Sequence, residues 1–231
     1  MEANDPNIPR AGFSIGGIRR SFPKHLSRFT VGVMCAIIIV LRLAPYFNQS
    51  GKWRNANGNN WLNVSTEPVN LSFDKGLVGW GKGSDYSEAA DYNVGYQPNA
   101  YESRPAGFVE SHVQHPHSYA GLCQWLRADH YWGKRVRLTA FLKTENITRG
   151  ACLFMHLDTR YGYRYWTSMP VLRGNNDWRQ YSVVIDVPTE AQGLIYSGLL
   201  SGSGRLLMAD VHIETVGKNI PLTQPPSLHR L

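Results

Sequence analysis

Four aromatic side chains and two arginines lie within one short stretch of the chain, at Tyr161, Tyr163, Tyr165, Trp166, Arg160 and Arg164. If this stretch is an extended strand, the three tyrosines share one face and Trp166 lies on the other. Aromatic rings stack on sugar rings or on other proteins, and guanidinium groups donate hydrogen bonds to hydroxyls or carboxylates. We therefore predict a surface that binds a ligand or a partner. Ordinary sheet packing beside an exposed turn is the alternative.

Three histidines form a second cluster, His112, His115 and His117 in the sequence SHVQHPHSYAG. Imidazoles this close together could hold a transition metal. Pro116 makes a turn between them, however, and no carboxylate stands at an obvious ligand spacing. We therefore expect no metal here, and we expect His156 to be a satisfied strand residue and not a catalytic base.

Three carboxylates, Asp74, Asp186 and Asp210, could hold a structural calcium ion, but the sequence has no D-x-D-x-D-G loop. It also has no G-x-S-x-G, Walker A or Rossmann motif. We therefore expect no catalytic residues and no cofactor, and predict that the protein is not an enzyme. Its formal charge of +7 is not clustered on one face as in nucleic-acid-binding proteins, so we expect no nucleic-acid partner.

The elements around these residues begin with an apolar segment at residues 29–47, which Arg42 alone interrupts with a charge. As a helix it would reach about 28 Å, close to the thickness of a bilayer core. We predict a single transmembrane helix, because a buried core helix and a cleaved signal peptide fit the flanking sequence less well. Arg42 would either reach toward the lipid headgroups or pair with a neighbouring membrane subunit.

Positive charges indicate the orientation of this helix. Five lysines and arginines precede it, whereas only Lys52 and Arg54 follow it closely. The positive-inside rule then places residues 1–28 in the cytoplasm and the large C-terminal part on the periplasmic or extracellular side. In that oxidising compartment Cys123 and Cys152 could form a disulfide, or they could be two small buried thiols in neighbouring strands.

Short apolar runs separated by glycine, asparagine or proline follow from about residue 70. Two of them, Arg135–Lys143 and Tyr181–Val187, alternate cleanly between apolar and polar residues. The other strands that we predict are Ala106–Val113, Leu122–Leu126, Ala151–Asp158, Tyr163–Met169, Gly193–Leu200 and Arg205–Val216. This pattern favours an antiparallel β-sandwich at 70–216. Residues 48–69 would be a linker, 83–105 an elaborated tyrosine-rich loop, and 217–231 an extended tail.

Four sequence stretches carry a family resemblance: NLSFDKGLVGW (70–80), WGKRVRLTAFLKTENI (132–147), NDWRQYSVVIDVPTEAQGLIYSGLLSGSG (176–204) and LMADVHIE (207–214). They resemble the bacterial jelly-roll modules of the galactose-binding-like, carbohydrate-binding-module-like class. The resemblance implies an all-β jelly-roll fold over residues 70–216. It implies little about function, because such sandwiches host many unrelated roles.

Two functions remain as hypotheses. The first is a non-catalytic accessory subunit of a bacterial inner-membrane complex, with photosynthetic reaction-centre and respiratory complexes as the ones to test first. Its partners would be the lipid bilayer, integral membrane subunits and a periplasmic subunit. The alternative is a membrane-tethered carbohydrate-binding module, which would bind an envelope glycan through Tyr161, Tyr163, Tyr165 and Trp166.

Overall fold

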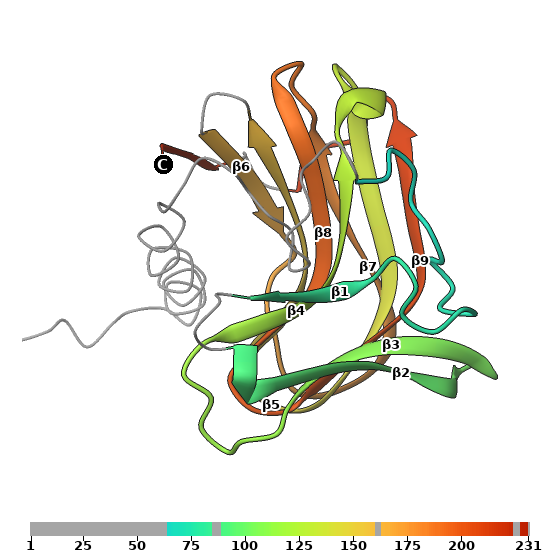
Figure 1. The fold of residues 1–231 in the computed structure, drawn as a ribbon, viewed down its shortest axis with the longest axis vertical. Helices are drawn as coiled ribbons and strands as arrows, with labels where there is room; N and C mark the ends of the chain where they lie inside the picture. The colour runs from blue at the N-terminus through green and yellow to red at the C-terminus, as the bar shows by residue number, and fades with distance from the viewer. Residues whose placement is uncertain (1–63, 85–88, 160–162, 224–226, 231) are drawn as a thin grey trace, which may run out of the picture.

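The computed structural model describes residues 64–84, 89–159, 163–223 and 227–230, and these ranges form an antiparallel β structure (Figure 1). Two short 3-10 helices, η3 (Ala89–Asp91) and η4 (Asp129–Tyr131), connect strands. The strands are β1 (Gly81–Ser84), β2 (Tyr92–Tyr101), β3 (Arg104–Ser111), β4 (Tyr119–Arg127), β5 (Arg135–Thr159), β6 (Tyr163–Ser168), β7 (Leu172–Asp186), β8 (Ala191–Ser201), β9 (Arg205–Val216) and β10 (Ser227–Arg230). The all-β antiparallel prediction is therefore confirmed.

One long strand, β5, connects two layers. Its N-terminal half pairs with β7 and β9, and its C-terminal half pairs with β8 and β6. The first layer therefore contains β1, β4, β8, the end of β5, β6 and β10, and the second contains β7, the start of β5, β9, β3 and β2. Bulges in the β5–β7 pairing lie between Leu142 and Ala151, where β5 passes from one layer to the other.

The core lies between the layers, because each strand turns its apolar side chains inward. In the first half of β5 the inner residues are Val136, Leu138, Ala140 and Leu142, all fully buried, as the alternating sequence predicts. In the second half Leu153, Met155 and Leu157 continue the same face. One cluster of buried side chains joins both layers. A sandwich with a single shared core results.

Two predictions about the elements are wrong. The tyrosine-rich stretch at 83–105 is not mainly a loop, because β2 runs along β3 through most of it. Tyr92 is fully buried, and its hydroxyl donates a hydrogen bond of 2.8 Å to the Ser118 carbonyl. The two strands predicted at Arg135–Lys143 and Ala151–Asp158 are one strand, which continues through Asn146 in a left-handed conformation with φ of 55°.

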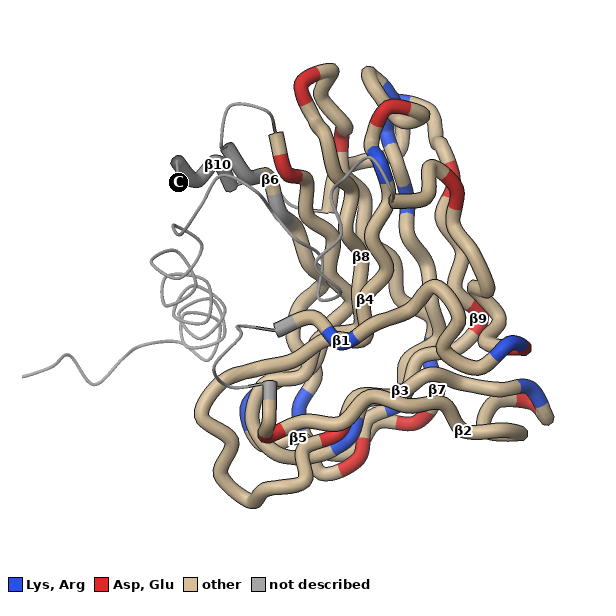
Figure 2. The backbone as a smooth tube through the Cα atoms, in the orientation of Figure 1, with Lys and Arg blue, Asp and Glu red and all other residues tan. Residues whose placement is uncertain are grey.

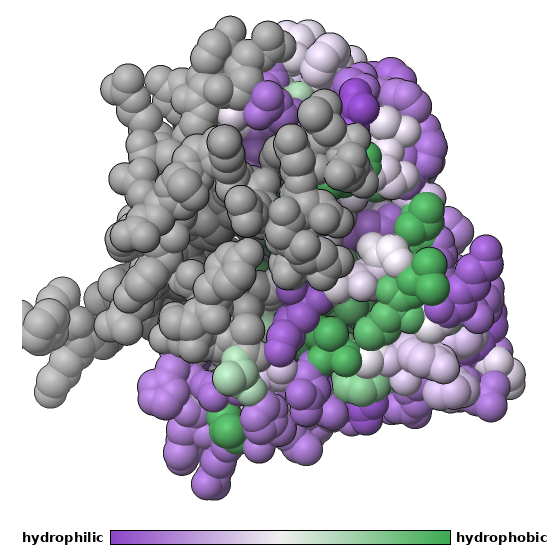
Figure 3. Space-filling model, viewed as in Figure 1, coloured by the Kyte–Doolittle hydropathy of each residue, from purple (hydrophilic) through white to green (hydrophobic). Residues whose placement is uncertain are grey.

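The loop before β1 is organised around Asn70. Its side-chain amide donates to the carbonyls of Gly76 and Val78 at 2.8 and 3.0 Å, and its oxygen accepts the Lys75 N–H at 3.0 Å. Hydrophobic residues gather over this part of the surface in Figure 3, where Val78 is 60% exposed.

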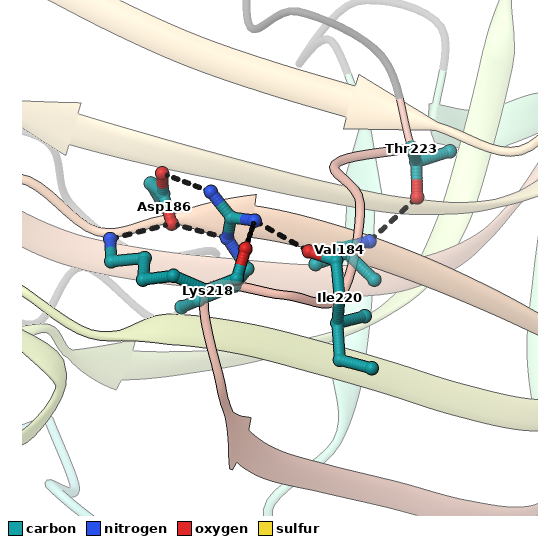
Figure 4. Close-up of polar contacts among 6 residues, drawn as sticks. Val184, Asp186, Lys218, Ile220 and Thr223 are labelled. Atoms are coloured by element: carbon teal, nitrogen blue, oxygen red, sulfur yellow. Dashed lines mark hydrogen bonds and ion pairs between the residues drawn. The ribbon is translucent and has the colours of Figure 1, made fainter.

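Residues 217–223, which follow β9, form a segment that Arg135 fixes (Figure 4). We call it the C-terminal segment. The Arg135 guanidinium donates to both carboxylate oxygens of Asp186, at 2.8 and 2.9 Å, and to the carbonyls of Lys218 and Ile220. Farther along, the Thr223 N–H donates to the Val184 carbonyl at 3.3 Å, and the Thr223 hydroxyl accepts the Val184 N–H at 2.7 Å. The segment thus lines β7 before the chain reaches β10, which pairs with β6.

The predicted transmembrane segment at 29–47, with Arg42, lies outside the described residues, as does the predicted cytoplasmic tail at 1–28. Within the described ranges, no helix has both the length and the apolar character needed to cross a bilayer.

Candidate functional site

The outer face of the first layer carries a row of large side chains. Ile195 in the middle of β8 pairs with Trp125 on β4 and with His156 on β5, and His156 in turn pairs with Trp166 on β6. Paired residues in neighbouring strands lie on the same face of a sheet. With strands about 4.8 Å apart, the Trp125 and Trp166 positions are separated by about 14 Å. We call Trp125, Ile195, His156 and Trp166 the aromatic row, in which Ile195 is only 4% and His156 12% exposed.

Charged residues lie at one side of the aromatic row. Gly193 of β8 pairs with Arg127 and with Asp158, and Asp158 pairs with Arg164 of β6. Arg127 also donates to Asp129 at 2.8 Å. In contrast, β8 itself contains no charged residue and β4 contains only Arg127 (Figure 2). Charge on this face is therefore concentrated beside the aromatic row.

Small and apolar side chains lie at the other side of the row. Ser197 pairs with Cys123 and with Phe154. At the neighbouring edge, a Cβ atom added to Gly83 of β1 would come within 2.4 Å of the Cys123 sulfur. A side chain at position 83 would therefore force the Cys123 thiol to move.

His156 and Asp158 make a close polar contact on this face. The Nε2 atom of His156 lies 3.2 Å from Oδ1 of Asp158, and the two side chains are 12% and 8% exposed. Imidazole and carboxylate groups together can donate and accept hydrogen bonds with hydroxyls. Hydrogen bonds made in such a sheltered place are stronger than those made in water. The face thus combines aromatic rings, hydrogen-bonding groups and low exposure.

The structure places the predicted site residues in two groups. Tyr165 pairs with Leu157 and is half-buried against the core, so the Tyr163 and Tyr165 positions share the inner face of β6. The Trp166 and Arg164 positions lie on the outer face, opposite His156 and Asp158. Arg160 and Tyr161 lie outside the described residues. A ligand role for these six residues stays a prediction.

The disulfide alternative is wrong for this structure, in which Cys123 and Cys152 are free buried thiols. Cys123 pairs with Ser197 and Cys152 with Leu199, so β8 lies between them. Two strand spacings amount to about 10 Å, whereas a disulfide requires Cα atoms closer than about 7 Å. Burial raises the pKa of each thiol to about 12.

The remaining candidates are the histidines and aspartates considered as metal ligands, and they do not form a shared site in the described residues. The Asp91 carboxylate accepts the backbone N–H of His117 at 3.0 Å, which lowers the pKa of Asp91. Each of the three possible calcium ligands has its own partner, Ser72 for Asp74, Arg135 for Asp186 and Arg104 for Asp210. In the described part of the chain, no group of three or more histidine, cysteine or acidic residues could hold a metal ion.

Sequence reasoning missed Trp125 and Phe154 as members of the candidate face. The alternation of Cys123 and Trp125 with Leu122 and Leu126 was the available signal. It identifies the outer side of β4, but it does not tell which strands lie beside it. The aromatic row becomes visible only once β4, β8, β5 and β6 are paired.

No family model matches the chain. A search of curated proteins found an uncharacterized HTH-type transcriptional regulator, YbfP of Bacillus subtilis (strain 168), 28% identical over 155 residues. The match covers 65% of this chain and 52% of the regulator, so the chain spans about half the length of that relative.

Solved structures with a similar fold include binding modules and an enzyme. A family 16 carbohydrate-binding module has a TM-score of 0.49 at 14% identity, covering 63% of this chain and 97% of its own. The CBM22-1 xylan-binding domain of Paenibacillus barcinonensis Xyn10C has a TM-score of 0.48 at 14% identity, covering 63% and 92%. A cyclase from Fischerella sp. TAU has a TM-score of 0.47 at 16% identity, and the match covers 66% of this chain and 98% of the cyclase. Similarity at this level does not identify a ligand.

Proposed function

We propose that the described sandwich is a carbohydrate-binding module and that a glycan binds across the outer face of its first layer. The observation that carries this proposal is the aromatic row, in which Trp125, His156 and Trp166 come from three strands and lie in register. Aromatic rings stack against the C–H faces of sugars, while polar groups beside them bond the hydroxyls. Asp158 and Arg127 supply such groups in the adjacent row, to which the Arg164 position also belongs.

We favour the carbohydrate-binding module over an accessory subunit of a membrane complex. The accessory-subunit hypothesis depends on Arg42, the apolar segment and the N-terminal tail, which all lie outside the described residues. The glycan hypothesis is supported by the aromatic row, with Trp125, His156 and Trp166 on three strands of one layer. In our proposal the module binds its glycan without catalysis, and residues 29–47 tether it to the inner membrane with the sandwich on the periplasmic side.

A glycan array probed with the full-length chain tests the proposal. The array should include xylan, for which the Paenibacillus module is named, and a β-1,4-galactan. We expect binding to at least one glycan and a loss of about tenfold or more in Trp125→Ala and in Trp166→Ala, because each removes a stacking surface.

Trp132→Ala is the matched control for these variants. Trp132 is 42% exposed, follows η4 and is not a member of the aromatic row; its indole N–H donates to the carbonyl of Ala191, four residues before Ile195 in β8. The Trp132→Ala variant should bind the glycan like the unaltered chain. Failure of the unaltered chain to bind any glycan, or equal binding by all three variants, would overturn the proposal.

A further inference from the structure

A groove lies on the outer face of the second layer, across β7, the first half of β5 and β9. It encloses about 550 Å³, a volume typical of small-molecule sites. Its lining includes Arg137, Thr139, Gln180, Ser182, His212 and Glu214. None of these residues belongs to the aromatic row, which is on the other layer.

Strand pairing arranges the lining in ordered rows. Thr139 in the middle strand pairs with Ser182 on β7 and with His212 on β9, so two hydroxyls and an imidazole lie side by side. Two residues before Thr139 in β5, Arg137 pairs with Glu214 of β9. In the opposite direction Phe141 pairs with Gln180. The lining thus has a charged end and a hydroxyl-rich middle, and Phe141 lies beside its Gln180 end.

The charges at the groove are already paired. Arg137 donates through Nε and Nη2 to one oxygen of Glu214, at 3.0 and 2.7 Å. The Nε2 atom of His212 lies 3.3 Å from the Asp210 carboxylate. Arg137, Glu214 and His212 therefore already have partners, and the neutral groups in the middle of the lining are the ones left for hydrogen bonds to a ligand.

The neutral polar groups, in contrast, are available to a ligand. Gln180 and Ser182 are exposed and Thr139 is half-buried. Among the residues that the structure describes, the side chains of Thr139, Ser182 and Gln180 have no hydrogen-bond partner. Hydroxyl and amide groups both donate and accept hydrogen bonds, as the hydroxyls of a sugar do.

An aromatic cluster lies beside the Gln180 end of the groove, outside its lining. Phe141 stacks on Tyr101 with ring centroids 4.7 Å apart, and Trp178 packs on Tyr101 at 5.0 Å. Phe141 and Trp178 are half-buried, whereas Tyr101 is buried. Their apolar edges provide contact for the C–H groups of a sugar ring beside the polar rows.

We propose that this groove is a second binding site and that its ligand is a neutral mono- or disaccharide. The available hydroxyls and amide in the lining, with aromatic rings beside its Gln180 end, match an uncharged ligand that is rich in hydroxyls. The proposal does not depend on the aromatic row, since it uses other residues on the opposite layer. With both sites occupied, one module would join two saccharide chains.

Calorimetric titration of the full-length chain with cellobiose, maltose and lactose tests this site. We expect at least one of the three to bind. The double variant Thr139→Val, Ser182→Ala removes both hydroxyls while keeping residues that a strand accepts, and it should weaken that binding about tenfold or more. Gln180→Ala, on the exposed surface, should weaken it in the same direction.

Thr215→Val is the control, because Thr215 is an exposed residue of β9 outside the groove lining. It should bind like the unaltered chain, and Trp125→Ala should retain the groove site even if it loses the glycan of the first layer. Binding that survives in both groove variants with normal thermal transitions would overturn the proposal. So would a folded chain that binds none of the three disaccharides.

Discussion

Cys123 and Cys152 show how sheet position determines the chemistry of a residue. Both lie on strands that pair with β8, and both are buried. Their thiols are neutral at physiological pH, because burial raises the pKa of each to about 12 and a thiolate is the reactive form. We therefore assign these residues to packing, with no redox role.

Alkylation followed by peptide mapping checks this assignment. In the folded chain, iodoacetamide at neutral pH should leave the peptides of Cys123 and Cys152 unmodified, and in denaturant both should react fully. Recovery of a peptide in which Cys123 is linked to Cys152 would contradict the assignment. So would rapid modification of either thiol under native conditions.

For single residues, the sequence predicts well which side of a strand a side chain occupies, but it predicts poorly which residues of other strands lie beside it. The alternation from Val136 to Leu142 correctly identifies the buried side of β5. The same rule separates Trp166 from Tyr165. However, alternation is a local property, and the register that brings Trp125 opposite Ile195 and His156 depends on strands far apart in the chain.

Among the elements, the C-terminal segment connects the edges of the two layers. It lines β7 through Val184 and Thr223, and farther on β10 pairs with β6. Arg135 is its main attachment, since this side chain is only 12% exposed and also holds Asp186. Hydrogen bonds from Arg135, followed by those from Lys218, lower the pKa of Asp186 to about 2.

This attachment predicts a dependence on pH and on Arg135. A carboxylate with a depressed pKa stabilises the fold above the pKa of the unfolded chain, near 4, and loses that contribution as pH falls toward 2. Thermal unfolding should therefore show a decrease in stability between about pH 4 and pH 2 that is smaller in Asp186→Asn. At neutral pH, Arg135→Gln should lower the free energy of unfolding by about 1 to 2 kcal/mol.

Arg137→Gln is the matched control for Arg135→Gln. Arg137 lies on the same strand and is also ion-paired, but with the half-exposed Glu214 and not with the C-terminal segment. Its loss should cost less than about 1 kcal/mol and should leave trypsin cleavage after Lys218 unchanged. Equal stability losses in the two variants, with no faster cleavage in Arg135→Gln, would show that Arg135 does not hold the segment.

The sequence predicts most elements where apolar residues alternate, and it fails where turn-forming residues lie inside a strand. β2 contains Gly95, Pro98 and Asn99, which suggested a loop, yet pairing with β3 and the burial of Tyr92 and Tyr101 hold it extended. Likewise, Asn146 and Gly150 suggested a turn between two strands. β5 instead tolerates them because bulges form at the passage between the layers.

For the whole molecule, the two layers present different outer surfaces around one shared core. The first layer carries the aromatic row, bordered by Arg127, Asp158 and the Arg164 position. The second layer carries the polar groove at Thr139 and Ser182. The sandwich itself could be predicted from the sequence, but neither surface could, because each is assembled from three or more strands. Our proposals assign a separate binding site to each of these surfaces.

The most direct test of the central claim is oxidative footprinting of tryptophans in the full-length chain, with and without a glycan that the array identifies. Mass spectrometry of the peptides would then report the oxidation of each tryptophan. We predict that the glycan protects Trp125 and Trp166 and leaves Trp132, which is 42% exposed, oxidised as before. Unchanged oxidation of Trp125 and Trp166 under saturating glycan would contradict the claim that the aromatic row is the binding surface.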